Sequence, residues 1–289
     1  MTLTSLVQSF VYGLLTGGLY ASLGIGFSLT WGSAKLLNIA HPTFSILACY
    51  IAYWLQIMIG MDPFNAILLI TPLFFLLGII LYVSLIRLVC RAKDVTFTSM
   101  IFTVGLAVFL ENLISFMWSP SPKVMVSQYT GASFIIANIH IPINLLLSFF
   151  ISLALIATTY FFIYKTFLGK AVRATWQNPD AAALYGINKN FVTMIMFGLA
   201  IATGGAAGVC FALISSFYPA LHNTWIIYLF IVVIMGGVGS VYGTLAGGML
   251  LGLFNSIVGL FIPNSWLPFI VYVALIILLW VRPEGLFKA

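Results

Sequence analysis

The chain has 289 residues, of which 63% are hydrophobic and 6% are charged. A soluble domain usually carries about 25% charged residues, so this chain has too little charge to cover its surface in water. The composition excludes a soluble enzyme, a nucleic-acid-binding module and a disordered chain. It indicates a polytopic all-α membrane protein of about eight or nine spans, some of them broken, since a spanning helix needs about 20 apolar residues. We expect one transmembrane domain over residues 1–289.

Polar residues, prolines and glycines divide the chain into nine apolar segments. In chain order these are 6–30, 43–60, 64–88, 97–118, 141–164, 190–216, 224–237, 244–262 and 266–281. Several are short or interrupted by glycine, so the number of full crossings is open by one or two.

The basic residues indicate the orientation, because cytoplasmic loops collect Lys and Arg. If the N-terminus is external and all nine segments cross, only Lys123 lies outside. Ten basic residues then lie on the cytoplasmic side: Lys35, Arg87, Arg91, Lys93, Lys165, Lys170, Arg173, Lys189, Arg282 and Lys288. We therefore expect an odd number of crossings, an external N-terminus and a cytoplasmic C-terminus.

The first interruption of the apolar pattern is the sequence NIAHP at residues 38–42. Transporters often break helices where the substrate passes, and irregular backbone at membrane depth needs protein or water to satisfy it. We therefore place Asn38 and His41 in a candidate translocation pathway. A hydrogen bond from His41 that terminates a helix is an equal alternative.

Glu111 is the only acidic residue well inside an apolar segment. A charge at the bilayer centre costs about 2.5–3.5 kcal/mol on insertion scales, so this side chain should face the interior of the bundle. Glu111 can be a protonated structural donor or can line the pathway, and both alternatives are open.

Residues 119–140 form the longest external loop. The stretch from Ser133 to Ile141 mixes β-branched and polar residues, which predicts a small strand or hairpin. The loop is either an irregular cap over the bundle or a docking surface for a partner that arrives from outside.

The longest cytoplasmic loop, residues 166–189, contains one short helix with both ends marked. Asn178 is a good N-cap, Pro179 suits the first helical position, and Asp180 suits the positive end of the helix dipole. Alanines follow, and Gly186 can supply the left-handed residue that ends the helix.

Two helical turns are not stable alone in water, so this helix must lie on another surface. That surface is either the membrane and the chain's own bundle, or a groove on a cytoplasmic partner that accepts a small-residue knob. The all-alanine face and the flanking cations Lys170, Arg173 and Lys189 favour the partner.

Five glycines have the four-residue spacing that lets membrane helices approach closely: Gly204, Gly208, Gly239, Gly243 and Gly247. Helix packing is the simpler interpretation for most of them. The run 235–243 is different, because its glycines are too dense for a stable helix. We assign four of its residues to the candidate translocation pathway: Gly236, Gly237, Gly239 and Ser240.

The sequence contains no GxxxxGK[ST] phosphate loop, no His/Cys cluster with metal-ligand spacing and no GxSxG elbow. We therefore expect that this chain is not an enzyme, holds no metal and cannot bind ATP through such a loop.

Five stretches together resemble, in order, the membrane-spanning permease subunits of branched-chain amino acid-type ABC importers. They are LLNIAHP at 36–42, GKAVRATWQNPDAAALYGIN at 169–188, FGLAIATGGAAGV at 197–209, MGGVGSVYGTLAGG at 235–248 and RPEGLF at 282–287. Because they are spread over nearly the whole chain, the resemblance is specific.

The resemblance implies an all-helical bundle of the larger-bundle ABC importer class, in a bacterial plasma (inner) membrane. It implies a second permease subunit, identical or a sister, two cytoplasmic ATPases that hold ATP and Mg, and an external solute-binding protein. No cofactor on this chain and no nucleic-acid partner are implied. Residues that match the coupling segment to the ATPase are Arg173, Asn178, Pro179, Asp180, Ala181, Ala182, Ala183, Leu184 and Gly186.

One difference from the family pattern concerns the pathway. Family members commonly carry Gly and then a small or acidic residue after the histidine of the motif, whereas Pro42 and Thr43 follow His41 here. The resemblance therefore implies amino acid import only as the general activity of the family. The same family also transports urea, short amides and other small metabolites. The alternatives are a self-contained channel or facilitator for a small neutral solute such as urea, and a membrane scaffold without transport.

Overall fold

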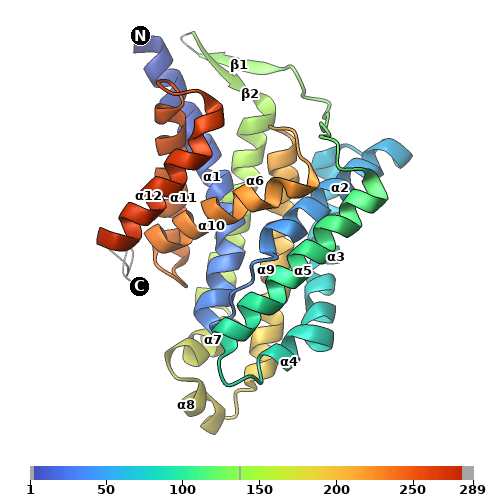
Figure 1. Ribbon diagram of the computed structural model, residues 1–289, viewed down its shortest axis with the longest axis vertical. Helices are drawn as coiled ribbons and strands as arrows, with labels where there is room; N and C mark the ends of the chain where they lie inside the picture. The colour runs from blue at the N-terminus through green and yellow to red at the C-terminus, as the bar shows by residue number, and fades with distance from the viewer. Residues whose placement is uncertain (1–2, 137, 282–289) are drawn as a thin grey trace.

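The computed structural model describes residues 3–136 and 138–281, which form twelve α-helices and two short strands (Figure 1). The first six helices are α1 (Leu3–Ala34), α2 (His41–Ile59), α3 (Pro63–Leu81), α4 (Arg87–Val89), α5 (Val95–Trp118) and α6 (Ile143–Lys165). The next six are α7 (Phe167–Gln177), α8 (Pro179–Leu184), α9 (Lys189–Ala212), α10 (His222–Gly236), α11 (Val241–Val258) and α12 (Leu267–Val281). The strands are β1 (Ser133–Ile136) and β2 (Ile139–Pro142).

Short irregular helices connect some of these elements. A π-helix, Tyr82–Ile86, joins α3 to α4, and 3₁₀-helices at Pro219–Leu221 and Asn264–Trp266 precede α10 and α12. Every predicted apolar segment contains a helix, which confirms the polytopic all-α class. In the described range, eight helical segments are long and apolar enough to cross a membrane, and α12 is a shorter apolar helix. The motif RPEGLF at 282–287, with Arg282, and the predicted cytoplasmic Lys288 lie outside the described residues.

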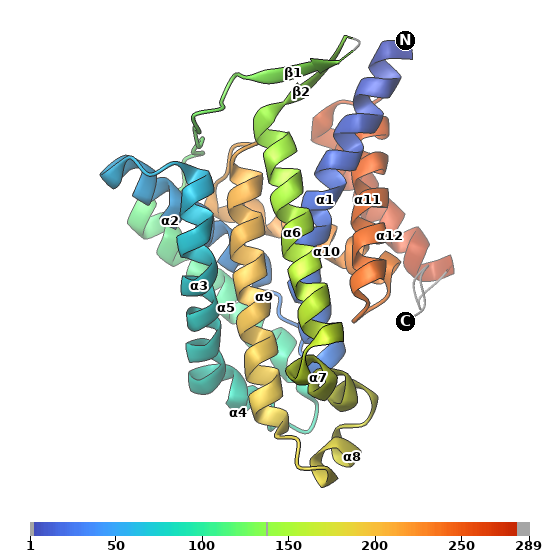
Figure 2. The same cartoon turned by 180° about the vertical axis from the view of Figure 1, so that it is seen from behind.

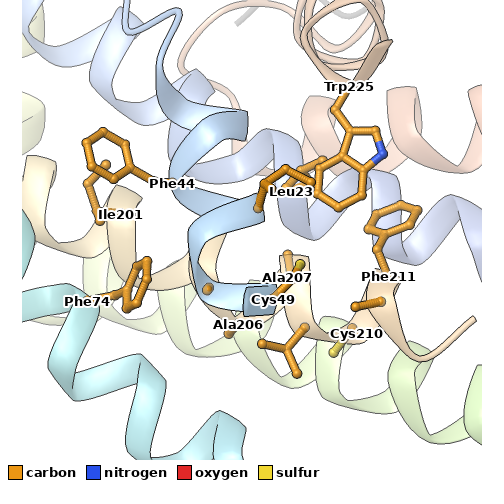
Figure 3. Packing of buried hydrophobic residues seen from close by; sticks show 14 of the residues in the cluster. Leu23, Phe44, Cys49, Phe74, Ile201, Ala206, Ala207, Cys210, Phe211 and Trp225 are labelled. Carbon is orange, nitrogen blue, oxygen red and sulfur yellow. The ribbon is translucent and has the colours of Figure 1, made fainter. Parts of the chain in front are cut away.

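The long helix α1 lies in the middle of the bundle. It contacts α11, α9, α6, α10 and α7, and Figure 2 shows α9 between α3 and α6. Most of the apolar window of α1 is buried by these neighbours. The core between α1, α2, α3, α9 and α10 holds side chains such as Leu23, Phe44, Phe74, Ile201 and Trp225 (Figure 3).

Glycines let the central helices touch backbone to backbone. A Cβ atom on Gly17 of α1 would lie 2.7 Å from the Cα of Met249 in α11, and one on Gly248 would lie 2.6 Å from the Cβ of Ala21. Side chains of any size would separate these helices. Lipid tails are as apolar as leucine, so close packing of this kind is what holds membrane helices together.

The predicted packing role of the spaced glycines is confirmed for four of the five. Gly204 and Gly208 of α9 lie against His41 and Ser45 of α2, while Gly243 and Gly247 of α11 lie against α10. Gly239, which the sequence analysis assigned to the glycine-dense run and not to helix packing, belongs to the turn between α10 and α11 and has φ +85°. Its spacing from Gly243 does not continue a helix face, because α11 begins only at Val241.

The two ends of the molecule carry different elements. The N-terminus and the β1–β2 hairpin lie at one end, whereas α4, α7 and α8 lie at the other (Figure 1). The hairpin is antiparallel, with Ser133 opposite Pro142 and Ile136 opposite Ile139, which confirms the predicted strand or hairpin. The predicted cytoplasmic cations of the α4–α5 and α6–α9 connections therefore share one end. That this end faces the cytoplasm stays a prediction.

Replacing Gly208 by alanine tests the close packing of α9 on α2. The new methyl group meets the carbonyl group of Ser45, so we expect Gly208→Ala to lower the free energy of unfolding by about 1–3 kcal/mol. Thermal unfolding of the purified protein in detergent measures the loss.

Gly105→Ala is the matched control, because a Cβ atom at Gly105 in α5 has no neighbour within 4 Å. A helix gains about 0.5–1 kcal/mol from such a change, so this variant should melt no lower than the wild type. Equal melting temperatures for the two alanine variants would contradict the packing described here.

Candidate functional site

The first helix break is an extended segment that returns into the membrane along α1. The Nε2 atom of His41, the first residue of α2, lies 3.2 Å from the carbonyl oxygen of Leu23. Leu23 lies eleven residues before Ala34, where α1 ends, which corresponds to about 16 Å along the helix axis. The segment 35–40 therefore runs back beside α1 from its end at Ala34, and α2 begins at membrane depth.

Hydroxyl groups of α5 satisfy the backbone of this returning segment. The N–H of Leu37 donates to Ser99 Oγ at 3.0 Å, and the N–H of Ile39 donates to Thr103 Oγ1 at 3.0 Å. Thr96 Oγ1 donates to the carbonyl oxygen of Lys35 at 3.0 Å. Bonds of this kind are required where backbone leaves a helix inside the bilayer.

Sequence reasoning missed these three hydroxyl residues, although a signal was present. Thr96, Ser99 and Thr103 are spaced three and four residues apart and therefore share one face of a helix. A polar stripe on an apolar segment indicates an internal partner, but the sequence does not say that the partner is the backbone of residues 35–40.

Asn38 and His41 both lie in the interior of the subunit, fully buried. The ring of His41 packs against Gly204 of α9, whose added Cβ would be 2.8 Å away, and lies 6.2 Å from the ring of Phe27. Since a carbonyl oxygen only accepts, the bond to Leu23 leaves His41 Nδ1 as an acceptor. Among the described residues, Nδ1 and both side-chain amide atoms of Asn38 have no hydrogen-bond partner. Contact of these residues with a solute stays a prediction, and the His41 bond goes to the middle of α1 and not to a helix terminus.

The second helix break is the turn Gly236–Ser240 between α10 and α11, hereafter the glycine turn. Gly237 and Gly239 have φ +81° and +85°, which only glycine adopts readily. Ser240 Oγ accepts from the N–H of Gly243 at 3.0 Å and so caps α11. The predicted break of the helix in this glycine-rich run is confirmed, with Gly236 as the last residue of α10.

The glycine turn lies against the last turns of α1. The N–H of Gly239 donates to Ser28 Oγ at 3.0 Å, and a Cβ on Gly32 would lie 2.7 Å from the Cα of Gly239. Both breaks therefore contact the same helix, the first at Leu23 and the second at Ser28 and Gly32. This common contact with α1 is the arrangement that the sequence could not reveal.

Glu111 pairs with a residue that the sequence analysis had not linked to it. Its Oε2 lies 3.8 Å from Nε2 of His222, and the two side chains are 27% and 5% exposed. The Nδ1 of His222 lies 3.0 Å from the carbonyl oxygen of Pro219. Glu111 thus turns partly inward, as predicted, and ties α5 to the start of α10. It lies about 12 Å farther along α5 than Thr103, so the structure does not group it with the first break.

The loop 166–189, predicted to be cytoplasmic, contains two helices, where the sequence analysis expected one. The predicted helix is confirmed as α8, with Asn178 Oδ1 accepting from the N–H groups of Asp180 at 3.1 Å and Ala181 at 3.0 Å. Gly186 ends it with φ +80°. The unpredicted helix is α7, capped by Thr166 Oγ1, which accepts from the N–H of Gly169 at 3.0 Å.

The exposed tip of this loop is formed by large apolar side chains and not by the knob of alanines that the sequence analysis considered. Ala182 is 5% exposed and faces its own chain, whereas Leu184 is 90% and Tyr185 is 88% exposed. The sequence analysis did not single out Tyr185. A Leu–Tyr pair beside a helix-ending glycine in a polar loop was nevertheless a signal for an apolar tip. Arg173 also turns toward its own chain, with Cζ 5.1 Å from the centre of the Tyr164 ring.

Comparisons with known proteins identify a sequence family. The sequence model of the family described as "Branched-chain amino acid transport system / permease component" matches residues 9–280. A probable branched-chain amino acid transport permease protein LivH of Methanocaldococcus jannaschii is 27% identical, with 94% of this chain and 90% of the relative covered. The high-affinity branched-chain amino acid transport system permease protein LivH of Salmonella typhimurium is 24% identical, with 97% and 94% covered. A solved structure, PsaBC from Streptococcus pneumoniae in complex with Fab, covers 97% of this chain and 91% of that chain at 17% identity, with a TM-score of 0.46.

Removing the hydroxyl of Thr103 tests the role of α5 in supporting the first break. Thr103→Val keeps the shape but leaves the N–H of Ile39 without an acceptor, so the free energy of unfolding should fall by about 1–3 kcal/mol. Thr103→Ser keeps the oxygen and should lose less. Thermal unfolding in detergent measures both.

Thr158→Val is the control, since Thr158 is exposed and its hydroxyl donates only to the carbonyl of Ala154 in its own helix. This change should leave the melting temperature near that of the wild type. If Thr103→Val melted at the wild-type temperature, α5 would not be the support of the returning segment.

Proposed function

Because the chain belongs to the family of branched-chain amino acid transport system permease components, we propose that it forms half of the passage of an ATP-driven importer. We take branched-chain amino acids as its substrates, since relatives that match over nearly their whole length carry that name. An external solute-binding protein delivers the amino acid, and a second permease subunit, identical or a sister, completes the passage.

The exposed tip of α8 is the observation that most supports coupling to an ATPase. Leu184 and Tyr185 are almost fully exposed on a helix with both ends capped, at the end of the molecule that holds the cation-rich loops. Large apolar side chains presented on a rigid element are typical of a protein interface. We propose that two cytoplasmic ATPases bind ATP and Mg and that one of them holds this tip in a surface groove.

The remaining partners and the location follow from this orientation. The chain is a multi-pass membrane protein, and we propose a bacterial inner membrane with the N-terminus outside and the C-terminus inside. The hairpin end then faces outward, where the exposed residues Phe134, Ile135 and Ile136 of β1 offer an apolar surface to the binding protein. The chain itself is a single domain without a cofactor or catalytic residues.

Opening of the passage requires movement at the two breaks. Asn38 and His41 are fully buried, and His41 lies against Leu23 of α1 and Gly204 of α9, so a solute can reach His41 only if α2 moves relative to α1 or α9. The glycine turn has little side-chain bulk to resist such a change. We propose that closure of the ATPases on ATP pushes α8 and switches the bundle between outward-facing and inward-facing arrangements.

Removing the apolar tip tests the proposed ATPase contact. The double variant Leu184→Ser/Tyr185→Ser should insert normally but should lose co-purification with the ATPase subunits, because most of the apolar area at the contact is gone. The amount of ATPase recovered with the tagged permease measures this.

Phe97→Ser is the matched control, because Phe97 is 57% exposed near the start of α5, at the same end of the molecule. This variant should recover the ATPase as the wild type does. Full recovery with the double variant would show that α8 is not the docking element.

Uptake in proteoliposomes tests the transport function as a whole. The permease pair, reconstituted with its ATPases and binding protein, should accumulate L-leucine only when ATP is present. Uptake without ATP and without partners would instead indicate a self-contained channel, and no uptake in either condition would indicate a scaffold.

A further inference from the structure

Helix α7 carries an aromatic side chain that contacts the glycine turn. A Cβ atom added to Gly239 would lie 3.8 Å from Cζ3 of Trp176, so the edge of the indole lies next to the space that a side chain at this position would fill. Trp176 lies two residues before Asn178, the N-cap of α8. Helix α8, which carries the exposed tip, therefore directly follows α7, whose Trp176 lies beside the glycine turn.

A second contact from α7 reaches the other flank of the same turn. Arg173 precedes Trp176 by three residues and so lies on the same side of the helix. Its Cζ is 5.1 Å from the centre of the Tyr164 ring. The ring of Tyr164 lies 4.7 Å from that of Tyr160 and 6.3 Å from that of Tyr242. Tyr242 stands just after Ser240, so α7 contacts the turn at Gly239 and the start of α11 through the tyrosines.

One side of α7 is exposed and another packs on the rest of the chain. Phe167, Lys170 and Gln177 are exposed, whereas Val172 and Thr175 are buried. Because Trp176 lies beside Gly239 and Arg173 lies over the Tyr164 ring, a push that moves the α7–α8 segment changes the position of both side chains relative to the turn. The glycine turn is itself held against α1 by the hydrogen bond from the N–H of Gly239 to Ser28 Oγ and by the close approach of Gly32.

Two polar atoms at this contact have no partner in the described part of the chain. They are Nε of Arg173 and Nε1 of Trp176, both buried. A buried donor without a partner costs about 1–3 kcal/mol. The contact between α7 and the glycine turn therefore leaves these two donors without hydrogen bonds to the described residues in this arrangement.

We propose that Trp176 and Arg173 are positioning residues that transmit movement of the α7–α8 segment to the glycine turn and from there to α1. Leu23 of α1 holds His41, so the same movement reaches the first break. This inference rests on the proposed function, because it requires an ATPase that acts on α8. It assigns the two side chains a role in coupling that is distinct from docking the ATPase.

The experiment measures coupling separately from assembly. The permease pair with its ATPases and binding protein is reconstituted in proteoliposomes, and L-leucine uptake and ATP hydrolysis are followed in the same sample. Trp176→Ala should keep ATPase recovery and most ATP hydrolysis, while leucine transported per ATP falls about twofold to thirtyfold, the range of coupling changes for residues outside ligand contact. Trp176→Phe keeps a ring against Gly239 and should restore most of this ratio.

Two further variants keep the inference falsifiable. Arg173→Gln removes the cation over Tyr164 without removing a ring and should lower the ratio in the same direction, which matters if Trp176→Ala fails to accumulate. Phe161→Ala removes an aromatic of α6 that is 58% exposed and lies beside Tyr160, and it should leave the ratio unchanged.

The outcomes separate the inference from the function on which it rests. A wild-type ratio in Trp176→Ala and in Arg173→Gln would overturn the role of these residues while leaving the importer intact. Equal loss of uptake and hydrolysis, or loss of ATPase recovery, would also overturn it, since that pattern describes docking or folding. If the wild-type complex showed no ATP-dependent uptake, the proposed function would fail, and this inference with it.

Discussion

The structure depends on one constraint, which is that a peptide group inside a bilayer has no water to bond. Helices meet this constraint by themselves, but the non-helical segment 35–40 runs back along α1 into the bundle. It can do so because Ser99 and Thr103 of α5 accept its N–H groups. The start of α2 inside the bundle, and with it the buried position of His41, follows from hydroxyls on a distant helix. The first break is therefore a property of α1, α2 and α5 together.

The two helix breaks are structurally connected because both contact α1. His41 bonds to Leu23, and the glycine turn bonds to Ser28 and packs on Gly32. Helix α1 also packs closely on α11 along glycine-rich faces. A displacement of α1 would therefore change the contacts of both irregular segments.

Much of the fold could be predicted from the sequence, whereas the site could be predicted only in parts. The nine apolar segments, the capped helix at Asn178 and the hairpin near Ser133 are local patterns, and local patterns determine helices, caps and turns. The partners of Ile39, Glu111 and Gly239 are not local. Glu111 meets His222 more than a hundred residues away, and Gly239 meets Ser28 across most of the chain. The inward orientation of Ala182 could not be predicted either, because the sequence does not show how α8 packs against α7 and α9.

The hydroxyl support of the first break has a consequence for how related sequences can vary. Ser99 and Thr103 bond to peptide groups and not to the side chains of Leu37 and Ile39. Drift among apolar residues at 37 and 39 therefore leaves these bonds intact, while positions 99 and 103 must keep an oxygen. Selection for the shape of the break would appear in an alignment as two hydroxyl positions on α5, far from the motif whose geometry they maintain.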